Sequence, residues 1–193
     1  MTTQTNAAKL ASPQELTALV QEVLAEAGRQ GASAAEANIG MSQGLAVTVR
    51  LGEVETVEHN RDKSLGVTVY LGQRSGSAST SDLRPAALRD TVRAAVTSAK
   101  YIAADDCSGL ADPERLATTV PDLDLYHPWR FTLDEAIERA RACEQAARDV
   151  DSRIRNSEGA TLSSYEGLDV YGNTHGFIGA TATTRHSLSC AVI

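Results

Sequence analysis

The sequence is poor in aromatic residues and cysteine, and each shortage excludes a class of protein. Aromatic side chains make up 4% of the 193 residues, so a core must be filled mainly by Ala, Val and Leu. The three cysteines, Cys107, Cys143 and Cys190, are odd in number and widely spaced. That spacing excludes a disulfide scaffold and a CxxC unit. We interpret the three side chains as reduced thiols of a cytoplasmic protein.

Positive charge and long apolar runs are also scarce. The chain has 18 Lys and Arg against 25 Asp and Glu, a formal net charge of -7. Because nucleic-acid binding needs a basic surface, this balance argues against a direct nucleic-acid partner. No apolar run reaches the about 18 residues of a membrane-spanning helix, and the polar N-terminus does not resemble a signal peptide. We therefore expect a cytoplasmic protein with no membrane partner.

Motifs for catalysis are missing from the sequence as well. It contains no HExxH, no GxSxG and no SxxK at a helix start. His175 and His186 could face each other across a hairpin and form a metal site with Asp169 or Glu166. Polar residues on an exposed or interface strand explain them equally well. We assign no catalytic residue and no metal ligand; the candidates for contact with a substrate or partner are Asn173, His175, Arg185 and His186.

Three helices are predicted from capping and periodicity. Ser12 followed by Pro13 and Glu15 predicts a helix start with a capping box, and Gly28 and Gly31 are expected to close the helix. A second helix is predicted over residues 84–103, with Asp82 as candidate cap. A third is predicted to start at Thr132, where Glu135 completes another capping box. Residues 105–131 between them are predicted to form an ordered connecting loop.

Strands are predicted on both sides of the last two helices. Leu65, Val67, Val69 and Leu71 give the clearest alternation. The predicted strands are 35–41, 45–49, 54–59, 65–71 and 76–80, then 154–158, 160–165, 168–171, 177–183 and 187–192. Because short links join them, neighbours must be antiparallel. The expected class is α+β, with antiparallel strand meanders and three helices packed on one face. We expect residues 1–11 to be a disordered leader and 12–193 one domain.

Several stretches, in order and spacing, resemble the N-terminal part of the TldD/PmbA family, and its PmbA (TldE) branch in particular. These are residues 50–58, 64–70, 76–82, 121–128, 156–159, 171–176 and 184–189, and the resemblance covers about residues 13–193. Family members are labelled both as metallopeptidases and as modulators of DNA gyrase. They continue past the position of Ile193, so the resemblance implies that this chain is the N-terminal part of a longer one.

The resemblance implies a subunit of a heterodimer that cleaves unfolded or extended peptides. A zinc-type HExxxH motif in the TldD-type chain would carry the chemistry, so we expect no cofactor in this chain and zinc in the partner. An exposed sheet edge could add the substrate as another strand, and residues 54–59 and 76–80 are the candidates. Alternatives are a homo-oligomeric peptidase with its metal site in the missing part, or a regulatory protein acting on gyrase. The isolated chain could form a homodimer through exposed apolar surface.

Overall fold

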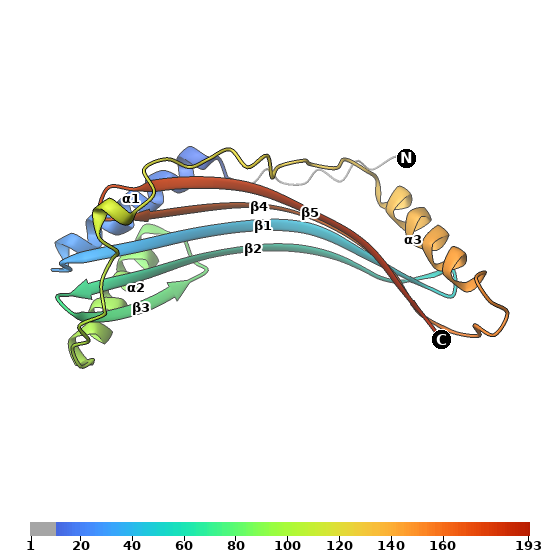
Figure 1. Ribbon diagram of the computed structural model, residues 1–193, viewed down its shortest axis with the longest axis horizontal. Coiled ribbons are helices and arrows are strands. Elements are labelled where there is room, and N and C mark those ends of the chain that lie inside the picture. Colours follow the sequence, from blue (N-terminus) through green and yellow to red (C-terminus); the bar gives the residue numbers. More distant parts are fainter. Residues whose placement is uncertain (1–10) are drawn as a thin grey trace.

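The computed structural model describes residues 11–193, which form one antiparallel sheet of five strands with three α-helices (Figure 1). Along the chain these are α1 (Pro13–Arg29), β1 (Ala34–Arg50), β2 (Glu53–Leu71), β3 (Arg74–Thr80), α2 (Pro85–Tyr101), a 3-10 turn (Pro113–Arg115), α3 (Leu133–Arg148), β4 (Ser157–Asn173) and β5 (Ile178–Val192). The strand order is β3-β2-β1-β4-β5. The two predicted groups of strands therefore join through β1 and β4 into a single sheet, and the predicted α+β class is confirmed.

Two of the three predicted helix starts are confirmed. Ser12 accepts a hydrogen bond from the Glu15 N–H at 3.2 Å, and the Glu15 carboxylate accepts from the Ser12 N–H at 2.6 Å. Thr132 and Glu135 form the same capping box at the start of α3. The predicted leader falls on residues 1–10, which lie outside the described residues, whereas Ala11 packs against the core.

The predicted cap of α2 is wrong. Arg84 occupies the N-cap position without a side-chain cap. Asp82 instead accepts hydrogen bonds from the backbone N–H and the guanidinium of Arg84. These bonds, first the one from the guanidinium, lower the pKa of Asp82 to about 2. The carboxylate is thus held outside the helix by the arginine that follows it.

The strands are longer than predicted. Segments 35–41 and 45–49 belong to one strand, β1, and segments 54–59 and 65–71 belong to β2. The five strands predicted after α3 are two, and β4 begins at Ser157 rather than at residue 154. Alternation of apolar residues marks a strand only where one face is covered. The polar middles of β1 and β2 lack that signal, yet their backbones continue the same ladder.

The helices pack on one face of the sheet, as predicted. Ile39 of β1 packs beneath α1 and α2, and Val47 of the same strand packs beneath α3. The register with β4 is continuous between these two odd-numbered residues, so both point to the same face. Figure 1 shows α1 and α2 at one end of the long sheet and α3 at the other. None of the helices in residues 11–193 is long and apolar enough to cross a membrane.

The loop of residues 102–132 connects the two ends. It runs the length of the sheet beside β5 (Figure 1). The Thr184 N–H donates to the Leu125 carbonyl at 2.9 Å, and the His127 N–H donates to Thr184 Oγ1 at 3.0 Å. The predicted ordered loop is therefore fixed along the outer strand.

Candidate functional site

The face of the sheet opposite the helices carries small and polar side chains, and we call it the polar face. It is formed by the even-numbered residues of β1 and by the residues that pair with them in the register. Its members include Glu36, Asn38, Gly40 and Ser42 of β1, Asp62, Ser64 and Thr68 of β2, Tyr165, Asp169 and Tyr171 of β4, and Thr183 and Arg185 of β5. Hydroxyl, amide and carboxylate groups can bind the main chain and polar side chains of another polypeptide.

A carboxylate with two tyrosine donors marks one end of the polar face. Glu36 accepts hydrogen bonds from the Tyr70 hydroxyl at 3.0 Å and the Tyr171 hydroxyl at 2.8 Å. Burial, together with the bond to Glu36, raises the pKa of Tyr70 to about 12. Both phenols therefore stay protonated at neutral pH, and their hydroxyl groups hold the Glu36 carboxyl group in one position.

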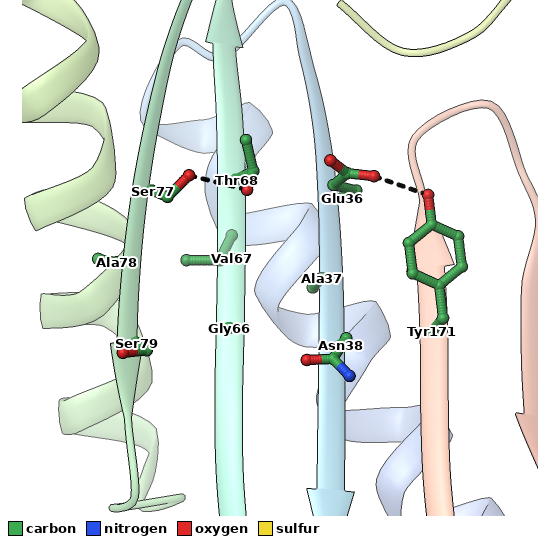
Figure 2. Close-up of a pocket in the computed structure, with 10 residues that line it drawn as sticks. All are labelled: Glu36, Ala37, Asn38, Gly66, Val67, Thr68, Ser77, Ala78, Ser79 and Tyr171. Carbon is green, nitrogen blue, oxygen red and sulfur yellow. Dashed lines mark hydrogen bonds between the residues drawn. The ribbon is translucent and has the colours of Figure 1, made fainter.

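A hollow of about 400 Å³ lies beside this cluster, between β1, β2 and β3. Figure 2 shows its side chains, with Glu36 and Tyr171 joined on one side and Thr68 and Ser77 on the other. The Thr68 and Ser77 hydroxyl oxygens are 2.9 Å apart. Asn38 is exposed in the hollow, and its side-chain amide has no hydrogen-bond partner among residues 11–193. Its amide can both donate to and accept from a ligand.

A second hollow of about 560 Å³ lies farther along the polar face. Its floor includes Gly40, where a Cβ would lie 2.7 Å from Asp169 Oδ1. Burial raises the pKa of Asp169, and its carboxyl group has no hydrogen-bond partner among residues 11–193. Arg185 lines the same hollow and is likewise unpaired within that range. The hollow thus offers a carboxylate and a guanidinium to a ligand that carries both charges.

The four predicted contact residues are not brought together. Arg185 lies on the polar face opposite Tyr165. Asn173 lies at the other end of β4, where it donates to the Tyr171 hydroxyl at 3.4 Å. Asn173 is buried and also accepts from the His175 N–H, so it shapes the turn between β4 and β5. His175 lies in that turn, whereas His186 pairs with Ser164 far along the strand. The two histidines therefore do not face each other, and of the two interpretations of these residues the metal site is not the one found within residues 11–193.

His186 lies on the helix side of the sheet, where it fixes the long loop. Its Nε2 is 2.9 Å from the His127 carbonyl, and its Nδ1 is 2.9 Å from the Ser164 hydroxyl. A carbonyl can only accept, so the Nε2–H of His186 donates to the His127 carbonyl. The Trp129 ring meets His186 edge-on at 5.7 Å. Within residues 11–193 no three His, Cys, Asp or Glu side chains are grouped as metal ligands.

The sequence prediction missed Glu36, Tyr70 and Tyr171. They lie on three strands and meet only through the pairing of β1 with both neighbours. The available signal was the alternation in β1, where Glu36, Asn38, Ser42 and Thr48 share one face and apolar residues the other. That pattern indicates a face that remains polar, although it does not identify the tyrosines.

Both segments predicted as sheet edges lie on one side of the sheet, whereas β5, the outer strand of the other side, was not predicted as an edge. Segment 76–80 belongs to β3, the last strand on one side. Segment 54–59 belongs to β2, and β3 pairs with β2 only from Leu65 to Leu71. Residues 53–64 of β2 therefore pair with β1 on one side and with no other strand of residues 11–193.

Two family models match the chain. Residues 35–99 match the PmbA/TldA metallopeptidase domain 1, and residues 126–193 match the PmbA/TldA metallopeptidase central domain. The sheet joins these two regions, because β1 of the first pairs with β4 of the second.

Relatives and a solved structure agree with these models. A metalloprotease PmbA homologue of Haemophilus influenzae is 46% identical over 95% of this chain and 40% of its own length. Metalloprotease PmbA of Escherichia coli O157:H7 is 50% identical over 82% of this chain and 35% of its own length. A Bacteroides thetaiotaomicron structure described as a candidate modulator of DNA gyrase superposes with a TM-score of 0.85 at 27% identity, over 95% of this chain and 42% of that one. The chain thus spans about two fifths of these proteins, and it belongs to the PmbA/TldD metallopeptidase family, in its PmbA branch.

Proposed function

We propose that this chain is the N-terminal part of a PmbA/TldE-type subunit of a cytoplasmic, heterodimeric metallopeptidase. In this proposal the subunit supplies surface for a TldD-type partner and for an unfolded or extended peptide. Residues 11–193 group no three ligand-type side chains, so they do not fit a catalytic metal and no catalytic step is assigned to them. Zinc in the TldD-type partner would polarise the scissile carbonyl and activate water.

The observation that carries the proposal is the polar face. It combines two hollows with side chains whose polar groups are unpaired, among them Asn38, Asp169 and Arg185. Such groups can bind the amides and charged ends of a peptide that has no fold of its own. The helices cover the other face, so a chain lying on the polar face displaces no packed element.

Steady-state peptidase kinetics of the complete subunit with its TldD-type partner test this proposal. Arg185→Ala and Asn38→Ala should each raise KM for an unfolded peptide about fivefold, since each removes roughly one hydrogen bond to a ligand. We expect kcat to change much less, because the reacting atoms lie elsewhere. Arg93→Ala on α2, exposed on the helix side, is the matched control and should leave KM unchanged.

Two results would contradict the proposal. The first is an unchanged KM in both polar-face variants while Arg93→Ala behaves as expected. The second is full peptidase activity of the complete subunit in the absence of any TldD-type chain. That result would favour the homo-oligomeric alternative, with the metal bound outside residues 11–193.

A further inference from the structure

The second hollow of the polar face is open because its floor consists largely of backbone. Gly40 of β1 and Gly167 of β4 lie in this floor. A Cβ at Gly40 would lie 2.7 Å from Asp169 Oδ1, and a Cβ at Gly167 would lie 3.2 Å from Thr183 Oγ1. Since a larger residue at either position would enter the hollow, glycine leaves room there for a group of a ligand.

Donor groups lie at one end of this hollow. The Tyr165 ring lies so close over Gly44 that a Cβ at that position would overlap it. Asn60 Nδ2 donates to the Tyr165 hydroxyl at 3.4 Å, so the hydroxyl hydrogen is free to donate elsewhere. Arg185 pairs with Tyr165 in the register, and its guanidinium has no partner among residues 11–193. This end of the hollow therefore suits a carboxylate.

Acceptor groups lie toward the other end. Asp169 is four residues beyond Tyr165 on β4, and Asp62 lies on the opposite side of β1. Neither carboxyl group has a hydrogen-bond or ion-pair partner among residues 11–193. Burial disfavours the charge of Asp169 and raises its pKa, and a bound cation would compensate that charge. This end therefore suits the ammonium or guanidinium group of a basic side chain.

The other charged residues at the hollow belong to the opposite face of the sheet. In the register Lys63 and Glu166 occupy positions on the helix side, where Glu166 pairs with Arg130 at 2.6 Å. In the first hollow, each oxygen of the Glu36 carboxyl group already accepts from a tyrosine. Of these two hollows, the second is therefore the one that presents unpaired charges of both signs.

The spacing of these charges fits an extended peptide. Asp169 pairs with Thr181, and Arg185 lies four residues farther along β5. At about 3.3 Å per residue, the two charged residues stand roughly 13 Å apart along the strands. An extended peptide has the same rise and turns its side chains i and i+4 to the same side, whereas side chains i and i+3 point to opposite sides.

We infer that the second hollow binds an extended peptide segment through one basic and one acidic side chain that are four residues apart in the peptide. The basic side chain reaches Asp169, and the acidic side chain reaches Arg185 and the Tyr165 hydroxyl. This inference rests on the proposed function, for which it specifies the class of substrate. The charges of the hollow select the peptide and also the direction in which it lies.

Binding of labelled peptides to the complete subunit, measured by fluorescence anisotropy, tests this inference without any cleavage. The peptides have blocked ends and a neutral background of Gly, Ser and Gln, with one Lys and one Glu four positions apart in either order. We expect the better order to bind about tenfold tighter than a peptide with Gln at both positions, and added salt to reduce the difference. A peptide with the two charges three positions apart should gain no more than about threefold.

Exchanging the charges of the hollow should reverse the preferred order of Lys and Glu. Asp169→Arg with Arg185→Asp makes this exchange at constant net charge. Asp90→Arg with Arg93→Asp, an exposed ion pair on α2, is the matched control and should keep the wild-type order. Circular dichroism shows whether each variant is folded. If the exchanged variant is not, Asp169→Asn with Arg185→Gln should abolish the preference for charged peptides.

Three results would overturn the inference. The first is equal affinity for charged and uncharged peptides. The second is an unchanged order preference in the exchanged variant, or an unchanged charge preference in Asp169→Asn with Arg185→Gln. The third is equally tight binding of a short peptide with free ends and no charged side chains, because the hollow would then bind peptide termini.

This experiment separates the inference from the proposed function. If KM rises in Asn38→Ala and Arg185→Ala while charged and uncharged peptides bind equally well, the peptidase role stands and the charge selection fails. If the subunit binds charged peptides with the expected spacing but its complex with a TldD-type chain cleaves no peptide, the peptide class stands and the peptidase role fails.

Discussion

The two ends of the sheet are covered by helices on the same face but are fastened in different ways. Beneath α1 and α2 the sheet buries large side chains such as Leu16, Ile39 and Leu65. Beneath α3 the buried cluster is Val47, Val49, Leu162 and the alanines Ala136, Ala140 and Ala160. Since stability from burial scales with the apolar area removed from water, the first end gains much more from its core.

The α3 end makes up part of this difference with polar contacts. Glu144 is 1% exposed, and its carboxylate accepts from the Leu51 and Gly52 N–H groups at 2.7 and 2.8 Å. Both turn residues have positive φ, so their N–H groups point out of the β1–β2 turn toward α3. Arg141 donates to the Gly52 carbonyl at 2.8 Å. Helix α3 is therefore attached both by its apolar surface and by hydrogen bonds from the β1–β2 turn to Glu144 and from Arg141 to that turn, which we call the clamp.

The largest expected effect comes from removing a core side chain at each end. Leu65→Ala should lower the free energy of unfolding by about 4 kcal/mol, because two helices enclose the site and keep the cavity open. Leu162→Ala should cost about 2 kcal/mol, since half-buried neighbours such as Trp129 can move into the space. Urea unfolding measures both. If Leu65→Ala does not fold, Val67→Ala against Val47→Ala repeats the comparison with the same two methyl groups removed at each end. Equal losses at the two ends would show that the cores are equivalent.

Removing the clamp should weaken only the α3 end. Glu144→Gln replaces one carboxylate oxygen with an amide group that cannot accept, and should cost about 1–3 kcal/mol. Amide hydrogen exchange should show faster opening of α3 with little change in α1 and α2. Asp134→Asn, an exposed position on the same helix away from the β1–β2 turn, is the control. Equal acceleration in α1 and α3 would mean that the two ends unfold as one unit.

The clamp also predicts a dependence on pH. Burial acts to raise the pKa of Glu144, but hydrogen bonds from Ser157, Gly52 and Leu51 outweigh it and lower the pKa. The carboxylate therefore contributes stability that is fully present above the pKa of an unfolded glutamate. This contribution is lost as the pH falls through the lowered pKa of the folded state. The difference between wild type and Glu144→Gln should accordingly vanish in acid.

Local signals predicted more of this fold than long-range ones. The capping boxes at Ser12 and Thr132 were predictable because each depends on residues three positions apart. The polar middle of β2 was divided into two strands because nothing covers it there, and apolar alternation needs a covered face. Glu144 carries no signal in its own helix, since its partners lie 92 and 93 residues earlier.

The polar face shows the same limit. Its polarity could be anticipated from the alternation in β1, but the cluster of Glu36, Tyr70 and Tyr171 depends on the register with two other strands. The possible pairing of His175 with His186 is absent for the same reason. Hairpin proximity was inferred from sequence distance, whereas β5 carries His186 eight residues beyond its start at Ile178, to a position opposite Ser164.

A smaller effect is expected at the first end, on the polar face. Tyr70→Phe leaves Glu36 with one donor and should cost about 1 kcal/mol at neutral pH. Because the folded pKa of Tyr70 is raised to about 12, its contribution is complete below the ordinary tyrosine pKa of 10.0 and is lost as the pH rises through the folded value. Tyrosinate absorbance should show that Tyr70→Phe removes a late-ionising tyrosine. Tyr101→Phe, 87% exposed, should not change stability.

The smallest effect concerns the loop that joins the ends. His186→Ala removes the hydrogen bonds to His127 and Ser164 and the contact with Trp129. Because His186 itself is exposed, global stability should fall by only about 1 kcal/mol. Trp129 fluorescence should nevertheless shift, and amide exchange near His127 should accelerate, because the loop detaches locally. His175→Ala in the β4–β5 turn is the matched control and should leave both unchanged. If His186→Ala also speeds exchange within α3, the loop transmits its attachment to that helix, and the two ends are coupled through the loop as well as through the sheet.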